Sequence, residues 1–366
     1  MYRFPRSDPD RVPVLLLTGF LGSGKTTLLN GLLQHPEMAR TAVIVNEFGD
    51  IPLDQHFIDA ALGEVIVLGN GCLCCSMQGD FEGVIGTLYA RRQQGALPPF
   101  ERIVVETTGL ADPAPIMQVL LNQPLVVDNF CLEGVITTVD AVHAARQVSE
   151  HAEAVKQIAL ADRLIITKTD LAAGHEVDAI SALLQRLNPG APQLRSTAAA
   201  VPPASVMPPR ELAADSLTQS AAESVPRDLA AESPLQRAAT SVAEREGGGA
   251  GSPGHLHAIH SFSLQADRPL PWTAFDRWLR ALRIRHADAL LRVKGIIEVE
   301  GEADPVAIHA VHHVMHPPVR LNRPALRGAG SRLVIITRGL TREEAAAGWE
   351  TLAASSSATS AQKEKG

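Results

Sequence analysis

A glycine-rich loop between an apolar run and a helical run constrains this chain more than any other feature. Val12 to Leu17 is apolar, which predicts a buried strand, and Lys25 to Leu33 has the spacing of a helix. The loop between them reads Gly19-Phe20-Leu21-Gly22-Ser23-Gly24-Lys25-Thr26-Thr27. Glycines let backbone N–H groups curl around phosphate oxygens, and a helix N-terminus adds positive potential there. The sequence therefore predicts a phosphate-binding loop.

Two side chains of this loop have expected roles. Lys25 should reach the β- and γ-phosphates of a nucleotide, and the Thr26 hydroxyl should bind Mg²⁺. A glycine-rich turn before an ordinary helix is the alternative, but the Gly-Lys-Thr ending is specific and correctly placed. The predicted nucleotide-binding residues of the loop are Gly19, Gly22, Ser23, Gly24, Lys25, Thr26 and Thr27.

Strand-like runs alternate with helical runs through the first half of the chain. Continuous Val, Ile and Leu strands separated by helices predict an α/β fold, a P-loop NTPase domain with a largely parallel sheet that is covered on both faces. After the first strand, the predicted strands are Thr41–Asn46, Val65–Leu68, Ile103–Val105, Gly134–Val139 and Leu164–Thr167.

Composition divides the chain into further parts. The sequence predicts an N-terminal arm over residues 1–11 and the P-loop domain over residues 12–195. Residues 196–256 are rich in Ala, Ser, Pro, Glu and Gly without an aromatic side chain, which predicts a disordered linker. Order should resume in a small α+β domain over 257–352, before a flexible tail over 353–366. Its predicted elements are helices over Trp272–Leu290 and Thr341–Leu352 and strands over Ile259–Leu264, Ile296–Val299, Val306–Val314 and Leu333–Thr337.

Charge and hydropathy exclude two classes of protein. The chain has 33 Lys plus Arg against 40 Asp plus Glu, so it lacks the basic excess typical of nucleic-acid binding. No apolar run approaches the roughly 20 residues of a membrane span, and the N-terminus lacks the apolar core of a signal peptide. We therefore expect a cytoplasmic protein that binds neither nucleic acid nor membrane.

A carboxylate and a glycine follow the strand predicted at Ile103–Val105. Glu106 stands at the carboxyl end of that strand, and Gly109 stands three residues later. An acid associated with Mg²⁺ and a backbone N–H that senses the γ-phosphate belong at these positions. Lys25, Glu106 and Gly109 are the predicted catalytic residues, and Thr26 and Glu106 the predicted Mg²⁺ site. Glu106 replaces the usual Asp of such NTPases, which leaves open a contact through water.

The strand predicted at Leu164–Thr167 leads into Thr167-Lys168-Thr169-Asp170, which is similar to the guanine-reading motif Asn-Lys-x-Asp. Asp170 can accept two N–H groups from the guanine edge, an arrangement that adenine cannot satisfy, and the stem of Lys168 can pack on the ring. GTP is therefore predicted over ATP. Thr167 replaces the usual Asn, which predicts that one hydrogen bond bracing the loop is weaker or absent.

Three of the four cysteines, Cys72, Cys74 and Cys75, stand within four residues of one another. They follow the strand predicted at Val65–Leu68, so we expect them at the sheet edge that also holds the phosphates. In a reducing compartment such a cluster is metal-binding or catalytic rather than disulfide-bonded. Thiolates suit Zn²⁺, and three of them need one further ligand to complete a tetrahedron. Inert buried cysteines and a redox-sensing thiol pair are the alternatives.

Together these motifs resemble the CobW-type metallochaperone GTPases, relatives of the GTPases that load nickel into urease and hydrogenase. The second domain looks similar to the family's carboxyl-terminal domain at Leu291–Gly295 and Leu333–Leu340. The matching motifs of the first domain are Gly19–Thr27, Asn46-Glu47-Phe48-Gly49 with Asp54 beyond it, Gly71–Cys75, Glu106–Pro113 and Thr167–Asp170.

The resemblance implies that Cys72, Cys74 and Cys75 bind metal, with Glu47 as a further ligand. It also implies a GTP-hydrolysing chaperone that passes Zn²⁺ to a client metalloprotein under nucleotide control. GTP and Mg²⁺ would order the segments Glu47–Asp54 and Glu106–Asp112. Co²⁺ is the second candidate metal, because a thiolate-rich site accepts both ions. A homodimer is compatible with the sequence, which does not fix the oligomeric state.

Three other functions stay open. A cobalt chaperone linked to cobalamin biosynthesis would use the same motifs. A redox-regulated P-loop NTPase would use the thiols for disulfides. A phosphotransferase would use the phosphate loop to phosphorylate a small molecule, but it needs neither Asp170 nor three thiols.

Four histidines, His309, His312, His313 and His316, stand close together in the second domain. On a helix they would share one face and suggest a metal site. The run is rich in Val and Ile, which instead predicts a strand. Its alternation would separate His309 and His313 from His312 and His316, and metal binding there stays an open alternative.

Overall fold

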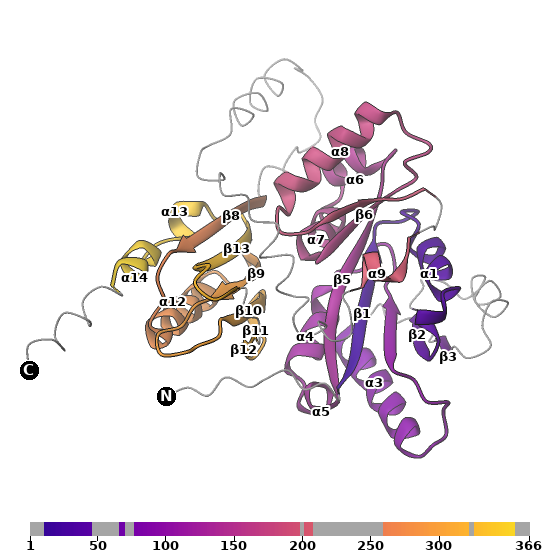
Figure 1. The fold of residues 1–366 in the computed structure, drawn as a ribbon. Coiled ribbons are helices and arrows are strands. Elements are labelled where there is room, and N and C mark those ends of the chain that lie inside the picture. Colours follow the sequence, from indigo (N-terminus) through magenta and orange to yellow (C-terminus); the bar gives the residue numbers. More distant parts are fainter. Residues whose placement is uncertain are drawn as a thin grey trace, which may run out of the picture.

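The computed structural model describes residues 11–45, 66–69, 77–197, 201–207, 259–321 and 326–355. These residues form two domains, each built on its own sheet. In Figure 1 the first domain carries the indigo, magenta and pink elements, and the second carries the orange and yellow ones.

The first domain contains a seven-stranded sheet with the order β3-β2-β4-β1-β5-β6-β7. Every neighbouring pair of these strands is parallel, which confirms the predicted α/β fold. The carboxyl ends of all seven strands therefore lie at one edge of the sheet. The strands are β1 (Val12–Gly19), β2 (Thr41–Val45), β3 (Ile66–Gly69), β4 (Arg102–Glu106), β5 (Phe130–Asp140), β6 (Arg163–Thr167) and β7 (Gln193–Arg195).

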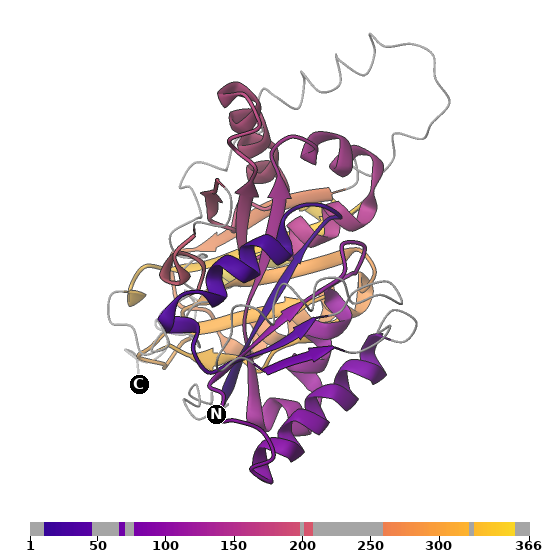
Figure 2. The same cartoon turned by 90° about the vertical axis from the view of Figure 1, so that its right-hand side faces the viewer.

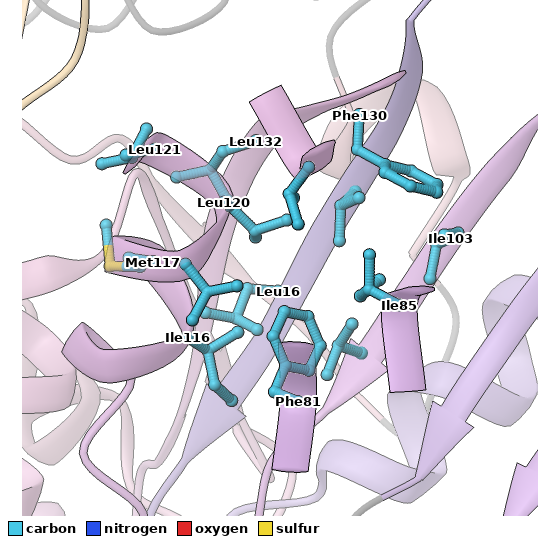
Figure 3. Packing of buried hydrophobic residues seen from close by; sticks show 14 of the residues in the cluster. Leu16, Phe81, Ile85, Ile103, Ile116, Met117, Leu120, Leu121, Phe130 and Leu132 are labelled. Atoms are coloured by element: carbon cyan, nitrogen blue, oxygen red, sulfur yellow. The ribbon is translucent and has the colours of Figure 1, made fainter. Parts of the chain in front are cut away.

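Helices cover both faces of this sheet. Successive side chains of a strand point to opposite faces; accordingly Leu15 and Leu17 join the apolar cluster under α1, and Val14 and Leu16 join the cluster under α3 and α4. Figure 2 shows α1 in front of the strands, and Figure 3 shows the packing in the second cluster. The helices are α1 (Lys25–Leu33), the short 3-10 helix η1 (Pro36–Met38), α3 (Met77–Gln93), α4 (Ala114–Asn122), α5 (Pro124–Asn129), α6 (Ala144–Glu150), α7 (Ala152–Leu160), α8 (Gly174–Leu187) and α9 (Pro203–Val206).

The predicted linker begins differently from the expectation. Ser196 is buried and its N–H donates to the carbonyl of Ile166 at 2.8 Å. Val206 and Met207, at the end of α9, are buried in the same apolar cluster as α1. The apolar side chains within residues 201–207 therefore extend the first domain beyond the position where composition changes. Residues 198–200 and 208–256 of the predicted linker lie outside the described residues.

The second domain is an antiparallel sheet with the order β11-β10-β9-β13-β8, and β12 pairs with β10. Phe275, Leu279 and Leu282 of α12 are buried in its core. The elements are β8 (Ile259–Ala266), α12 (Trp272–Arg285), β9 (Leu290–Ile297), β10 (Val306–Val311), β11 (Val314–Met315), β12 (Val319–Arg320), β13 (Ser331–Arg338), α13 (Arg342–Ala345) and α14 (Trp349–Ser355).

Two helix predictions in this domain differ from the structure. The predicted helix over Trp272–Leu290 ends at Arg285, and Leu290 begins β9 instead. Leu290 fits the helical spacing of α12, but its side chain is buried in the sheet. The predicted helix over Thr341–Leu352 is two short helices, because Gly348 lies between them with a φ of 82°.

The histidine-rich run is a tight hairpin and not the single strand predicted over Val306–Val314. Val311 pairs with Val314, so His312 and His313 form the turn, and His312 has a φ of 51°. The N–H of His316 donates to the carbonyl of His309 at 2.9 Å. The turn therefore makes His309 and His316 neighbours across the hairpin. The predicted alternation had placed them on different faces of one strand. Among the described residues, no group of three or more His, Cys, Asp or Glu could hold a metal ion.

The two domains pack against each other through apolar and charged residues. Val311 and Val314 of the β10–β11 hairpin join the apolar cluster that contains α4. Beyond the end of α7, Asp162 forms ion pairs with Arg292 and Lys294 of β9, and the Lys294 Nζ lies 2.8 Å from the Asp162 Oδ1. We call these three residues the interdomain ion cluster.

Candidate nucleotide-binding site

The phosphate loop follows β1 and ends at α1, as predicted. Gly24 caps the helix with a φ of 90°, a conformation that suits glycine, and the N–H of Ser23 donates to the Phe20 carbonyl at 3.1 Å. The Lys25 Nζ donates to the carbonyls of Gly19 at 2.9 Å and Phe20 at 3.2 Å. The lysine ammonium is thus held against the loop that it is expected to serve.

The predicted magnesium residues lie together. Glu106 ends β4, whose neighbour is β1, and Thr26 opens α1. The Thr26 hydroxyl donates to the Glu106 Oε1 at 2.6 Å. A hydroxyl and a carboxylate are the hard oxygen ligands that Mg²⁺ accepts in nucleotide sites. The longer side chain of Glu106 therefore reaches Thr26 directly.

Gly109 lies against the phosphate loop. A Cβ at this position would come within 2.6 Å of the backbone nitrogen of Leu21, so only glycine allows the two backbones to approach this closely. The segment before it is fixed to β1, because the Thr107 N–H donates to the Leu17 carbonyl at 2.9 Å and the Thr107 hydroxyl to Thr18 at 2.9 Å. We call residues 107–112 the switch loop.

The guanine-type motif is joined to the phosphate loop. The Thr167 hydroxyl lies 2.7 Å from the Ser23 carbonyl and 3.2 Å from the Val139 carbonyl, and it can donate to either. The brace is therefore present through one hydroxyl donor, and that it is weaker than an asparagine brace stays a prediction. The Thr169 hydroxyl donates to the Ser196 carbonyl at 3.1 Å, and Asp170 is exposed. An exposed carboxylate on a braced loop can accept hydrogen bonds from a base.

Asp140 is a site residue that the sequence analysis missed. It ends β5, is 2% exposed, and accepts a hydrogen bond from the Lys168 Nζ at 2.7 Å and from the Val142 N–H at 2.8 Å. Burial alone would raise the pKa of Asp140, but hydrogen bonds from Lys168 and His143 outweigh it and hold the pKa below its usual value. Lys168 itself has a φ of 57°. The ionised carboxylate thus fixes the lysine that precedes Asp170.

The predicted zinc ligands Glu47, Cys72, Cys74 and Cys75, together with Asp54, lie outside the described residues. The strands that lead towards them are described. Val45 ends β2 opposite Glu106, and Gly69 ends β3 opposite Val45. The chain thus leaves both strands at the sheet edge that holds the phosphate loop.

This edge defines the class of the protein: a P-loop nucleotide-binding protein with a parallel sheet. Residues 13–195 match the family model of the CobW/HypB/UreG nucleotide-binding domain, and residues 259–353 match that of the cobalamin synthesis protein cobW C-terminal domain. The chain belongs to the CobW/HypB/UreG family, and the resemblance drawn from its motifs is confirmed.

Two bacterial zinc chaperones and one crystal structure are similar to this chain over different shares of its length. The zinc chaperone YjiA of Escherichia coli K12 is 31% identical over 83% of this chain and 87% of its own length. A zinc chaperone CobW of Pseudomonas aeruginosa is 40% identical over 40% of each chain. The crystal structure of the Zn(II)-bound YjiA GTPase from E. coli has a TM-score of 0.69 and 27% identity, and it covers 93% of this chain and 99% of that one. Both domains therefore have a structural counterpart in one relative.

Within the part of the chain that the structure describes, no helix combines the length and the apolar character needed to cross a bilayer.

Proposed function

We propose that this chain is a GTPase that carries zinc and delivers it to client metalloproteins in a nucleotide-dependent way. The observation that carries the proposal is the set of polar groups at one sheet edge: Lys25 on the phosphate loop, the 2.6 Å contact between Thr26 and Glu106, and the close approach of Gly109. These groups supply a cation for the phosphates, oxygen ligands for Mg²⁺ and a backbone donor beside the γ-phosphate.

Guanine is the proposed base. Asp170 follows Lys168, which Asp140 holds in place, and Thr167 ties this segment to the phosphate loop. A carboxylate that pairs with the two N–H groups of guanine would be left unsatisfied beside adenine, so the site should reject ATP. Two relatives are named as GTPases, a YjiA structure and the zinc-regulated GTPase metalloprotein activator 1 of Schizosaccharomyces pombe, which supports this choice.

Zinc is the proposed cargo, with Cys72, Cys74, Cys75 and Glu47 as its ligands. Three clustered thiolates favour Zn²⁺, and the YjiA and CobW relatives described above carry zinc in their names. The proposed compartment is the cytoplasm, where such thiols stay reduced. Nucleotide control would follow if the segment after Gly69 responds to the γ-phosphate at the same sheet edge.

Phosphate release from GTP and from ATP, measured on the full chain with Mg²⁺ and again with EDTA, tests the nucleotide part of this proposal. We expect GTP turnover to exceed ATP turnover by at least about tenfold, because the Asp170 carboxylate can pair with two N–H groups of guanine and with none of adenine in the same position. EDTA should abolish the activity. Equal turnover of the two nucleotides, or turnover that ignores EDTA, would refute the proposed GTPase.

A further inference from the structure

A buried glutamine on α7 contacts the switch loop. Gln157 is 0% exposed, and its Nε2 donates to the carbonyl of Gly109 at 3.1 Å and to the carbonyl of Ala111 at 3.0 Å. An amide nitrogen carries two hydrogens, so both are used on this one loop. The two acceptors flank Leu110, so the glutamine side chain fixes the backbone on both sides of one residue.

The orientation of this amide follows from its neighbours. Turning the amide over would place its oxygen against two carbonyl oxygens, which repel it, so the nitrogen must face the loop. The Gln157 Oε1 is buried and has no hydrogen-bond partner among the described residues. A buried acceptor without a partner is unfavourable, and an apolar side chain at this position would avoid it. The donors towards the loop are therefore the feature that explains a glutamine here.

Neighbouring contacts hold the same loop to the same helix. The Lys156 Nζ lies 2.9 Å from the Asp112 Oδ2, and the Asp112 Oδ1 accepts the N–H of Ala114 at 3.0 Å. The Thr137 hydroxyl of β5 donates to the Gln157 carbonyl at 2.8 Å, a bond to the backbone of α7. The contact of the side-chain amide with the switch loop is separate from this contact of the helix with β5.

We propose that Gln157 is a positioning residue for nucleotide hydrolysis, which holds the backbone of the switch loop so that Gly109 stays beside the phosphate loop. This inference rests on the proposed GTPase function. Gln157 contacts neither the phosphate loop nor the guanine-type motif in any hydrogen bond described above, so it acts through the backbone of Gly109. Misplacement of a catalytic group by about 1 Å costs up to about a hundredfold in rate.

The test is Gln157→Met, which keeps the length of the side chain and removes its donors. Thr137→Val is the matched control, because it removes a buried hydrogen bond to the backbone of the same residue and leaves the contacts with the switch loop in place. We expect Gln157→Met to lower kcat for GTP by about tenfold to a hundredfold, with KM within about twofold of the parent value. Thr137→Val should keep kcat within about threefold of the parent value, even if its thermal midpoint falls as much as that of Gln157→Met.

Hydrogen exchange of the peptide that covers residues 107–112, measured on nucleotide-free protein, separates this inference from the proposed function. Exchange should be faster in Gln157→Met than in the parent and unchanged in Thr137→Val. If the parent protein hydrolyses no GTP but this pattern holds, the GTPase fails while the positioning of the loop stands. An unchanged exchange rate in Gln157→Met, an unchanged kcat, or an equal loss of kcat in both variants would overturn the inference.

Discussion

The nucleotide edge and the interdomain ion cluster both bury charged side chains, but they arrange them differently. At the nucleotide edge, Lys25 donates to backbone carbonyls of a loop and Glu106 accepts from a hydroxyl. A bound phosphate or cation can replace these neutral partners. In the ion cluster, Arg292 and Lys294 contact Asp162 and are 3% and 6% exposed at their side chains. The charges at the nucleotide edge are placed to bind a ligand, and the charges of the ion cluster hold the two domains together.

Electrostatics in the ion cluster are dominated by burial. Burial opposes ionisation of Asp162, but Arg292 and Lys294 outweigh it and hold the pKa of Asp162 well below its usual value. Burial lowers the pKa of Lys294 to about 8, although Asp162 acts against that shift. His309 lies near the same charges, and burial together with Arg292 lowers its pKa well below the usual value. In this cluster two cations of the second domain thus meet one carboxylate of the first, with the buried His309 nearby.

Helix α7 contacts both regions. Near its middle, Lys156 and Gln157 contact the switch loop, and at its end the Leu160 carbonyl accepts a hydrogen bond from Arg292. The stacking of Phe20 on His151, with ring centroids 4.7 Å apart, adds a contact between the phosphate loop and the start of the helix. The nucleotide edge and the ion cluster are therefore both in contact with this nine-residue helix.

Removing the central carboxylate of the ion cluster should have the largest effect on stability. Asp162→Ala leaves two buried cations without their partner, so we expect the free energy of unfolding to fall by about 3–5 kcal/mol. Urea titration monitored by circular dichroism measures the change. Asp178→Ala is the control, because Asp178 pairs with Arg195 at 2.6 Å on the surface, where a pair contributes below about 1 kcal/mol. Equal losses in the two variants would contradict the role given to burial.

Lys25→Ala should show the opposite profile. We expect hydrolysis of GTP to fall by at least about a hundredfold, because the ammonium stabilises charge on the transferred phosphoryl group, while the fold is retained. Steady-state phosphate release and a thermal melt measure the two effects. Lys294→Met, which removes the buried lysine of the ion cluster, should keep hydrolysis within a few-fold of the parent. If Lys294→Met abolished turnover and Lys25→Ala did not, the comparison of the two regions would be wrong.

Asp170→Asn should change the preferred base. The amide cannot accept both N–H groups of guanine, so GTP affinity should fall by roughly tenfold to a hundredfold, and xanthosine triphosphate should bind better than GTP. Competition against a fluorescent nucleotide measures both constants. A GTP affinity equal to that of the parent would remove the guanine interpretation and leave the phosphate loop intact.

Acid should lower the free energy of unfolding through buried histidines before it protonates the carboxylates. His309 and His316 have pKa values lowered by burial, that of His316 to about 4. Below about pH 6.5, the unfolded pKa of histidine, these side chains bind protons in the unfolded chain but not in the folded one. The free energy of unfolding therefore decreases as the pH is lowered. Each such histidine should cost about 1.4 kcal/mol per pH unit between about pH 6 and pH 4. Urea titrations across this range should show a smaller slope in His309→Phe; an identical slope would contradict the prediction.

Much of the nucleotide site could be predicted from the sequence, because its residues follow strands. Glu106 stands directly after a continuous apolar run, and Lys25 ends a specific loop, so short-range patterns identify them. Asp140 was missed because the predicted strand stopped at Val139, one residue before the carboxylate. Gln157 could not be found in this way, since it lies inside a helix and its partner carbonyls are 46 and 48 residues away in the chain.

The second domain was harder to predict because its sequence fits more than one period. Leu290 continues the helical spacing of α12, yet it begins a strand, and Arg292 and Lys294 interrupt the apolar pattern of that strand. These charges are buried against the other domain, where Asp162 pairs with both of them. Their partner lies 130 and 132 residues away, so no local pattern could have indicated it.

The nucleotide dependence of zinc binding is the central claim, and a competition titration against a chromophoric chelator measures it most directly. Zinc affinity is determined for the full chain in the nucleotide-free, GDP-bound and GTP-analogue-bound states. A coupling of about 1–3 kcal/mol between the sites predicts that the affinity changes by at least several-fold with the nucleotide. Replacing Cys74 and Cys75 by Ser should remove both the tight binding and its nucleotide dependence. The same zinc affinity in all three states of the parent protein would contradict a nucleotide-gated zinc carrier.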